Sequence, residues 1–429
     1  MFEIREKPEM VERAMLVSIY FDPSEAGEKQ AMLDELEDLV SNLGIGIAGK
    51  HLIKSRDMHA KFLCGTGKAQ EVKQLALDCR ADCVVFDNML SPSQQREWER
   101  LVDECVIDRE EVILDIFARR ARTREATLQV ELARMQYSLP RMARMWNHLD
   151  RQGGGSGGGK GGGGAARGEG EKQIEVDRRL ARARIEAIQR ELVLVTRQRA
   201  TQRKERERQA VATAAIVGYT NAGKSSLLSL VSGSEVMARD MLFATLDTTT
   251  RKIELPHGQP LLLTDTVGFI RNLPHRLVEA FKSTLEEAVL ADFLIQVVDA
   301  SDPEAVRHYE TTLEVLNELG AGDKPMIVVL NKVDLVPEER RGALETLLAP
   351  HFSGRVVPMS VKEGNGEGDL LNACVEMLES RVRRARFLIP YTRSDLVAAM
   401  HSEGKVFSTE YVEEGTLLEA VLPVAFYNK

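Results

Sequence analysis

One stretch of the sequence, GYTNAGKS at residues 218–225, constrains the fold more than any other. It follows the apolar run AAIV and precedes SLLSLV, which predicts a buried strand, a glycine-rich loop and then a helix. Gly218, Gly223, Lys224 and Ser225 fit the spacing GxxxxGK followed by Ser or Thr. In such a loop the backbone N–H groups surround phosphate at the start of the helix, and the lysine reaches the terminal phosphates. The stretch therefore predicts a nucleotide-binding domain built around a parallel sheet.

The second motif, LLLTDTVGF (261–269), ends a predicted strand in the pattern DxxG. Asp265 can hold Mg²⁺ through water, and the Gly268 N–H can meet the γ-phosphate. A glutamine directly after this glycine would orient the attacking water, but the residue there is Phe269, which cannot. Catalytic help must then come from another switch residue, an ion or a partner. One hypothesis is that Asn221 coordinates a monovalent cation such as K⁺ near the β/γ bridge; bracing of the loop is the alternative.

Two more motifs select the base. IVVLNKVD (327–334) ends a strand in NKxD, so Asp334 can accept hydrogen bonds from the guanine N1–H and 2-amino groups, a donor pair that adenine lacks. Asn331 would brace the loops, and the stem of Lys332 would pack along the ring. A last predicted strand is followed by the residues that would face the guanine O6: Ser360, Val361 and Lys362. Four motifs in this order predict a GTPase.

The segment between the first two motifs, DMLFATLDTTTRKIEL (240–255), must supply the first switch. A threonine is needed there to complete the Mg²⁺ shell with Ser225 and to sense the γ-phosphate. Sequence spacing alone leaves four candidates: Thr245, Thr248, Thr249 and Thr250.

Charge is distributed unevenly along the chain. The net charge of −9 alone would argue against a polyanionic partner. Yet residues 117–208 hold 22 Lys and Arg against 11 Asp and Glu, a net of +11, so the remainder carries −20. Apolar residues recur there in alternating steps of four and three, which is the heptad pattern of packed helices. The two runs are Leu128, Leu132, Met135, Leu139, Met142, Trp146 and Leu149, then Ala181, Ile185, Ile188, Leu192 and Val195.

Two such runs joined by one connector predict an antiparallel helical hairpin, with Pro140 kinking its first arm. Arginines crowd the polar faces of both arms. A solvated face would mix charges of both signs, so the excess favours nucleic-acid phosphate, which the arginine fork can bind with two bonds at once. These arginines are Arg119, Arg120, Arg122, Arg124, Arg134, Arg141 and Arg144 on one arm, and Arg178, Arg179, Arg182, Arg184, Arg190, Arg197 and Arg199 on the other.

The connector, RQGGGSGGGKGGGGAARGEGE (151–171), has twelve glycines among the eighteen residues from 153 to 170. Two to five residues would close a helical hairpin. Glycine carries no side chain, so such a loop can enter a narrow RNA crevice and make backbone contacts. An engineered linker is the alternative. We predict a loop that is disordered in the free protein and orders on its RNA partner.

The first 115 residues alternate strand-like and helix-like runs, which predicts a small parallel sheet with helices on its faces. CGTGKA (64–69) resembles a phosphate loop, but Phe62 and Ala69 stand where glycine and Ser or Thr are needed, so we expect a turn. The five cysteines lack zinc-ligand spacing and read as buried thiols. The predicted strands are 15–21, 45–53, 82–87 and 105–109, and the helices are 29–44, 67–81 and 91–104, the last capped by Ser91.

These motifs, with their flanks, resemble the HflX family of translational GTPases. The resemblance covers most of the chain. It rests in the nucleotide-binding part on GYTNAGKS, LFATLD (242–247), DTVGFIRNLPH (265–275) and NKVD. In the N-terminal part it rests on KFLCGTGKA (61–69), VIDREEVILDIFARRARTREATLQVELARMQY (106–137) and QIEVDRRL (173–180). Two departures stand out: Glu169 replaces the proline of the family's connector, and Val361 replaces its usual alanine.

The resemblance implies a factor that binds the large ribosomal subunit and its ribosomal RNA. It implies that the GTP form splits stalled or stress-inactivated ribosomes into subunits and that hydrolysis drives release. With no glutamine after the DxxG glycine, the isolated protein should hydrolyse GTP slowly, and ribosomes should accelerate the reaction. The alternatives are a GTPase switch acting on another RNA or protein partner, in RNA modification or transcript regulation, and an adaptor with vestigial hydrolysis. We expect no DNA partner, no integral membrane segment, a cytoplasmic location and a monomer.

The resemblance also places the Mg²⁺ threonine at Thr245, so Ser225, Thr245 and Asp265 (through water) would hold the metal, and Lys224, Thr245 and Gly268 would act in catalysis. The expected fold is α/β: an N-terminal α/β subdomain (1–115), a basic hairpin (116–210) with connector 153–170, a Ras-like P-loop GTPase domain (211–385) and a small α+β domain, βαββ (386–429). The expected GTP contacts are Gly218, Tyr219, Thr220, Asn221, Ala222, Gly223, Lys224, Ser225, Phe243, Ala244, Thr245, Leu246, Asp247, Asp265, Thr266, Val267, Gly268, Asn331, Lys332, Val333, Asp334, Ser360, Val361 and Lys362.

Overall fold

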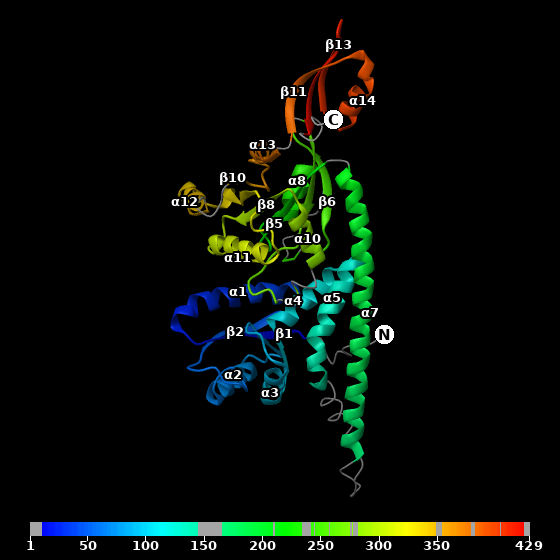
Figure 1. Cartoon of the computed structure of the whole chain (residues 1–429). Coiled ribbons are helices and arrows are strands. Elements are labelled where there is room, and N and C mark those ends of the chain that lie inside the picture. The colour runs from blue at the N-terminus through cyan, green and yellow to red at the C-terminus, as the bar shows by residue number, and fades with distance from the viewer. Residues whose placement is uncertain are drawn as a thin grey trace. The chain divides into compact units, whose positions relative to one another are not determined.

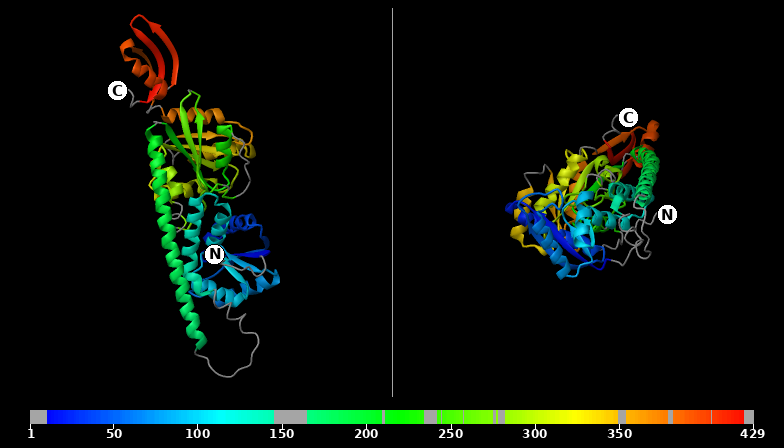
Figure 2. Two further views of the ribbon diagram at one scale, coloured as in Figure 1. Left: turned by 90° about the vertical axis from the view of Figure 1, so that its right-hand side faces the viewer. Right: turned by 90° about the horizontal axis from the view of Figure 1, so that it is seen from below.

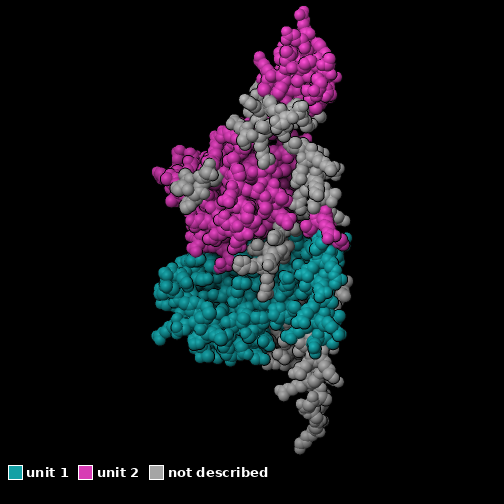
Figure 3. Space-filling view, viewed as in Figure 1, with its two compact units in different colours: residues 1–193, 273–280 teal, residues 194–272, 281–429 magenta. Residues whose placement is uncertain are grey.

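The computed structural model divides into two compact units, coloured separately in Figure 3. Unit 1 comprises Met1–Val193 with Leu273–Ala280, and unit 2 comprises Leu194–Asn272 with Phe281–Lys429. Within them the structure describes residues 11–144, 165–208, 211–233, 242–243, 245–256, 258–274, 277, 282–348, 354–378, 382–403 and 405–423.

Unit 1 holds a four-stranded sheet whose strands all run parallel, in the order β2-β1-β3-β4. Strands and helices alternate along the chain, which confirms the α/β class predicted for this part. The core gathers Val17, Val84 and Trp98 with their neighbours. The elements are β1 (Arg13–Tyr20), η1 (Pro23–Glu25), α1 (Ala26–Asn42), β2 (Gly46–Lys54), α2 (Thr66–Asp78), β3 (Cys83–Phe86), α3 (Pro92–Val102), β4 (Cys105–Asp108) and α4 (Arg109–Arg120).

Helix α3 begins where the sequence predicted. The Ser91 Oγ accepts the Gln94 N–H at 3.2 Å, and the Gln94 Oε1 accepts the Ser91 N–H at 2.9 Å. This reciprocal capping box supplies acceptors for N–H groups at the helix start. The CGTGKA stretch leads into α2 from a segment, 55–65, that follows β2, and Phe62 and Cys64 lie in the core.

Two helices form the arms of the predicted hairpin: α5 (Arg124–Ser138) and α7 (Ala165–Arg208), side by side in Figures 1 and 2. The part of α7 up to Val193 belongs to unit 1. Leu128 and Leu132 of α5 pack against Ile188 of α7, with Ile185 and Leu192 beside them. Burial of this apolar seam stabilises the pairing of two helices whose other faces are charged.

Two ion pairs give the direction of the arms. Arg124 binds Glu191 at 3.0 Å, and Arg184 binds Glu131 at 2.7 Å. Going up α5 from 124 to 131 corresponds to going down α7 from 191 to 184, so the arms run antiparallel, as predicted.

The ends of the arms differ in part from the expectation. α5 stops at Ser138 and continues as the 3-10 helix η2 (Leu139–Arg144), consistent with the bend expected at Pro140. α7 begins at Ala165, so residues 165–170, predicted as connector, are helical. Residues 153–164, Trp146 and Leu149 lie outside the described residues. The boundary expected between 115 and 116 falls inside α4.

Unit 2 holds a six-stranded sheet in the order β10-β9-β8-β5-β7-β6, parallel except for β6. This is the P-loop GTPase topology that the motifs predicted. Apolar side chains of the central strands, such as Ile216, Ile295 and Val329, form its core. The elements are β5 (Ala212–Gly218), α8 (Lys224–Ser232), β6 (Thr249–Glu254), β7 (Pro260–Asp265), α10 (Lys282–Leu290), β8 (Phe293–Asp299), α11 (Ala305–Glu318), β9 (Met326–Asn331), η3 (Val333–Leu335), α12 (Glu338–Leu348), β10 (Arg355–Pro358) and α13 (Glu367–Leu378).

The chain ends in a smaller β-α-β-β element with an antiparallel sheet of order β11-β13-β12. Met400 of its helix packs against Leu418, Ala420 and Leu422. The predicted element order is present, although its first strand begins at residue 382 rather than near 386. The elements are β11 (Val382–Ile389), η5 (Tyr391–Arg393), α14 (Ser394–Glu403), β12 (Lys405–Val412) and β13 (Gly415–Pro423).

Candidate active site

The first motif forms the turn between β5 and α8 at the carboxyl end of a central strand. Gly218 (φ 143°) and Gly223 (φ 99°) both adopt backbone angles that favour glycine. A Cβ at Gly218 would lie 2.3 Å from the Val297 backbone oxygen, so a side chain does not fit there. The turn places the N-terminus of α8, whose first N–H groups have no helical partner, at the end of the sheet. That arrangement binds phosphate.

Asn331 connects three of the motifs. Its Nδ2 donates to the Ala222 backbone oxygen at 2.8 Å, and its Oδ1 accepts the Val361 N–H at 3.1 Å. A Cβ at Gly223 would lie 2.3 Å from the same Nδ2, so this glycine makes room for the amide. The phosphate loop, the NKxD loop and the last loop are therefore joined by one side chain.

Three oxygen-bearing side chains converge beside the P-loop. The Ser225 Oγ lies 2.6 Å from the Thr245 Oγ1 and donates to the Asp265 Oδ2 at 2.6 Å. The Thr245 Oγ1 also donates to that Oδ2, at 2.8 Å. The other carboxylate oxygen, Asp265 Oδ1, is buried and makes no hydrogen bond with the described residues.

This cluster fits a magnesium ion. Mg²⁺ prefers oxygen ligands, and Asp265 brings a buried carboxylate with one oxygen still lacking a partner. Burial raises the pKa of Asp265, since an unneutralised carboxylate is poorly solvated there. A cation at Ser225 and Thr245 would favour the charged carboxylate.

Lys224 is buried, and its Nζ donates to the Tyr219 backbone oxygen at 2.6 Å. Burial lowers its pKa to about 8, despite the attraction of Asp265. An ammonium group has three N–H donors, so phosphate oxygens would supply the acceptors and the negative charge that this position lacks.

The DxxG loop packs directly on the phosphate loop. A Cβ at Gly268 would lie 2.9 Å from the Lys224 Nζ and 3.0 Å from the Thr220 Cα. Phe269 is buried; its N–H donates to the Gly218 oxygen at 3.1 Å, and its oxygen accepts the Thr220 N–H at 2.8 Å. Phe269 thus attaches the two loops to each other and offers no polar group to an attacking water.

The structure separates the four threonine candidates of the first switch. Thr249 and Thr250 lie in β6, and the Thr250 hydroxyl pairs with Thr264 at 2.9 Å. Among the hydrogen bonds of the described residues, Thr245 is the candidate that joins Ser225 and Asp265. Its neighbours Phe243 and Leu246 are buried, while Ala244 lies outside the described residues.

Among the residues expected to contact the base, some side chains are paired within the protein and others are exposed. Lys332 adopts φ 62°, and its Nζ binds the Asp299 Oδ2 at 2.6 Å. The Asp334 carboxylate is exposed. Ser360 is buried, and its Oγ accepts the Glu363 N–H at 3.3 Å, while Lys362 is exposed.

One contributor was not predicted, and another makes contacts beyond the one expected of it. Asp299, at the carboxyl end of β8, fixes the Lys332 ammonium. Tyr219 was expected only to contact the nucleotide, but its hydroxyl and ring contact other parts of the fold. The signal for Asp299 was available, because carboxyl ends of parallel strands meet at one edge of a sheet.

Three family models match: GTP-binding GTPase N-terminal at residues 30–118, GTP-binding GTPase middle region at 120–206, and 50S ribosome-binding GTPase at 213–332. GTPase HflX of Chlamydia pneumoniae is 40% identical over 431 residues, which cover 100% of this chain and 89% of that protein. GTPase HflX of Escherichia coli (strain K12) is 39% identical, with 97% and 95% covered. The chain belongs to the HflX family of GTPases.

HflX-family membership makes the chain a GTPase, which converts GTP and water to GDP and phosphate. A solved GTP-binding protein from Sulfolobus solfataricus in complex with GDP is 23% identical, with a TM-score of 0.43, covering 86% of this chain and 99% of that one. No helix in the described part of the chain combines the length and apolar character needed to cross a membrane.

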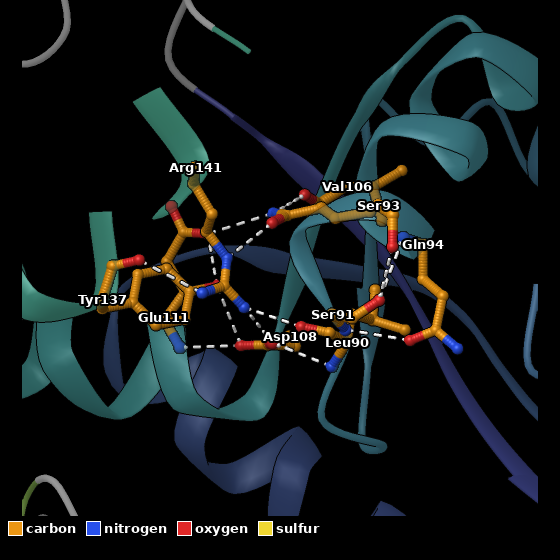
Figure 4. Close-up of polar contacts among 10 residues, drawn as sticks. Leu90, Ser91, Ser93, Gln94, Val106, Asp108, Glu111, Tyr137 and Arg141 are labelled. Atoms are coloured by element: carbon orange, nitrogen blue, oxygen red, sulfur yellow. Dashed lines mark hydrogen bonds and ion pairs between the residues drawn. The ribbon is translucent and has the colours of Figure 1, made fainter. Parts of the chain in front are cut away.

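One arginine that the sequence placed on the polar face of the HflX-family hairpin is buried instead. Arg141 follows α5, and Figure 4 shows its side chain among groups at the end of the unit 1 sheet. Its Nε donates to Gln95 at 2.9 Å and its Nη2 to the Leu90 oxygen at 2.7 Å. Asp108 lies 3.5 Å from Nη2, and the Tyr137 ring 3.6 Å from the guanidinium. These acceptors explain why the charge can leave the surface.

Other predicted phosphate-binding arginines also have partners inside the protein. Arg119 donates to the Leu43 oxygen at 2.7 Å, and Arg120 to the Asn42 side chain at 2.9 Å. Arg134 binds Asp115 at 3.1 Å. On α7, Arg179 and Arg182 are exposed and form no ion pair with the described residues. The basic surface is therefore smaller than the sequence count suggested.

Proposed function

We propose that this GTPase binds the large ribosomal subunit in its GTP form, splits stalled or stress-inactivated ribosomes, and leaves after hydrolysis. The observation that carries the proposal is the match of residues 213–332 to the 50S ribosome-binding GTPase family, a range that includes the phosphate and DxxG loops and ends at Lys332 of the NKxD motif. Membership of the HflX family supports it over nearly the whole chain.

We assign the nucleotide roles from the site geometry. Ser225 and Thr245 would hold Mg²⁺ directly and Asp265 through water, and the ion would neutralise charge on the β- and γ-phosphates. Lys224 would donate to the terminal phosphates, and the Gly268 N–H would bind a γ-phosphate oxygen. Water attacks the γ-phosphorus, the bond to the bridging oxygen breaks, and GDP and phosphate are the products. Asp334 would accept from guanine, with Asn331 holding the loops together.

Because Phe269 has no polar group to orient the attacking water, hydrolysis needs help from another group. We propose that Asn221, exposed in the P-loop with φ 59°, coordinates K⁺ near the β/γ bridge. GTP turnover should then be faster in K⁺ than in equal concentrations of Na⁺, and Asn221→Ala should remove the difference. Equal turnover in both salts would exclude this role.

The exposed face of α7 is the proposed contact with ribosomal RNA. Arg179 and Arg182 can approach phosphate without breaking an ion pair of the described structure. α7 ends at Arg208 and β5 begins at Ala212, so few residues join this arm to the strand that carries the P-loop. The proposed RNA contact therefore lies on the helix that leads into the strand before the P-loop.

Sucrose-gradient sedimentation tests the proposal. With a non-hydrolysable GTP analogue, the protein should move with the large subunit and intact ribosomes should decrease; with GDP neither should occur. An Arg179→Glu, Arg182→Glu variant should bind the subunit less well, while Arg190→Glu, which alters an arginine already paired with Glu186, serves as the matched control. Binding only to free RNA or to another protein would favour a GTPase switch with a different partner.

A further inference from the structure

We propose that Tyr219 is a positioning residue for GTP hydrolysis, because its hydroxyl holds the DxxG loop in the place from which the Gly268 N–H meets the γ-phosphate. The proposal rests on the role assigned to Gly268 above and does not depend on the ribosome.

Tyr219 is the first residue of the phosphate loop after Gly218, and its side chain is buried. The phenol oxygen accepts the backbone N–H of Arg271 at 2.8 Å. Arg271 lies three residues after Gly268, so this bond ties the far end of the DxxG loop to the phosphate loop.

Besides the Ser225–Asp265 bond, three hydrogen bonds of the described residues join the two loops around Phe269 and Arg271. Two are between backbones: Phe269 N–H to the Gly218 oxygen at 3.1 Å, and Thr220 N–H to the Phe269 oxygen at 2.8 Å. The third is the bond from Arg271 to Tyr219. Of these three, it alone uses a side chain, so a substitution can remove it and leave both backbone bonds in place.

The Tyr219 ring is held in a fixed orientation. It stacks on His308 of α11 with ring centroids 3.7 Å apart and an angle of 7° between the planes. The His308 Nδ1 lies 3.6 Å from the Asp302 carboxylate, in the segment before α11. From the same segment, Glu304 lies 3.4 Å from the Arg271 guanidinium. This segment therefore contacts Arg271 directly and reaches the Tyr219 ring through His308.

The DxxG loop at Gly268 is packed closely against the phosphate loop. An added Cβ there would lie 2.9 Å from the Lys224 Nζ and 3.0 Å from the Thr220 Cα, so the loop is already in close contact with the phosphate loop. An amide that stabilises charge on a γ-phosphate must be held in place before the reaction. Losing the bond at Arg271 should let the loop shift and weaken that interaction in the transition state most of all.

GDP has no γ-phosphate, so the bond should matter for GTP hydrolysis and little for GDP binding. Tyr219→Phe keeps the ring and its stacking on His308 and removes only the acceptor. We expect kcat for GTP to fall about three- to tenfold, which is the scale of one intramolecular hydrogen bond. The dissociation constant for GDP should stay within about twofold.

Three measurements on each variant test the proposal. They are the rate of phosphate release in a single turnover, the affinity for fluorescent GDP, and the thermal unfolding temperature. The matched control is Tyr137→Phe, which removes another buried hydroxyl that donates to Asp108 at 3.1 Å in unit 1. It should lower the unfolding temperature and leave GTP turnover unchanged. Unchanged turnover in Tyr219→Phe would overturn the proposal, and so would equal losses in turnover and GDP affinity. Gly268→Ala keeps the N–H, but its Cβ would push the loop away from Lys224 and Thr220, so turnover should fall there too. Normal turnover in this variant would contradict the need for a fixed Gly268 N–H, whereas a loss there with unchanged turnover in Tyr219→Phe would contradict only the role of Tyr219.

Discussion

Both units bury a cation, and the two cations differ in what surrounds them. In unit 2 the Lys224 ammonium has one hydrogen-bond acceptor among the described residues, the Tyr219 oxygen, and its pKa is lowered to about 8. In unit 1 the Arg141 guanidinium donates to Gln95, Leu90 and Tyr137 and lies beside Asp108. The protein itself supplies acceptors for the hydrogen-bond donors of the arginine, whereas the lysine needs a ligand to supply them.

This difference separates a binding group from a structural one. A buried charge that lacks acceptors destabilises the free protein and is stabilised by an anionic ligand. A buried charge with a full set of partners contributes to the fold and has little left to offer a ligand. Substitutions at the two cations should therefore have opposite consequences.

Arg141→Met should have the largest effect on stability. It leaves the Asp108 carboxylate buried without its cation, and burial already raises the pKa of that group. Removing one partner of a buried ion pair costs about 3–5 kcal/mol. Denaturant unfolding should show this loss, with GTP affinity unchanged. Arg182→Met, at an exposed position, is the control and should change stability by less than about 0.5 kcal/mol.

Lys224→Met should act in the opposite way. Nucleotide affinity should fall at least about 100-fold, close to 3 kcal/mol, because charge-assisted bonds to phosphate are lost. Stability without nucleotide should not fall. The folded pKa of about 8 lies below the ordinary 10.5, so at pH 7 the buried ammonium is a cost that the substitution removes. Fluorescent-nucleotide titration and thermal unfolding measure the two effects, and a marked loss of stability would contradict the comparison.

The same contrast shows what could be predicted from sequence. The P-loop and DxxG glycines were predictable because close contacts with Val297, Asn331 and Lys224 leave no room for a side chain at Gly218, Gly223 and Gly268. Arg141 was not, since its acceptors Leu90 and Asp108 lie 51 and 33 residues away, and only the fold brings them to it. The heptad pattern predicted that α5 and α7 pair. It does not predict which of their charged residues form ion pairs between the two helices.

The assignment of Mg²⁺ to Thr245 shows an intermediate case. Spacing left four threonines, and the family resemblance selected one. The structure supports that selection, because the Thr245 hydroxyl contacts Ser225 and Asp265, whereas the Thr250 hydroxyl in β6 pairs with Thr264. Sequence patterns could not show these contacts, because they define the limits of a strand poorly.

The connector offers a smaller test of whether the two regions act separately. Replacing Gly153–Gly164 with a three-residue turn should leave intrinsic GTP turnover within about twofold, since the nucleotide loops are built from unit 2. Ribosome splitting, followed by light scattering, should slow about tenfold, equivalent to about 1.4 kcal/mol. Unchanged splitting would mean that the glycines only close the hairpin.

The smallest expected effect is on the pH dependence of nucleotide affinity. Lys224 must be charged to bind phosphate, and in the free protein it loses its proton as pH rises through about 8. GDP affinity should therefore be about twofold lower at pH 8 than at pH 7, and should keep falling above that.

The claim that Lys224 lacks a full set of partners until phosphate arrives is tested most directly by counting the protons taken up with GDP. Calorimetric titrations at pH 7 and pH 8, each in two buffers of different ionisation enthalpy, give this number. With a free pKa of about 8 and a charged lysine in the complex, uptake should rise from about 0.1 proton per GDP at pH 7 to about 0.5 at pH 8. The same uptake at both pH values would show that Lys224 is already satisfied in the free protein, and would contradict the account.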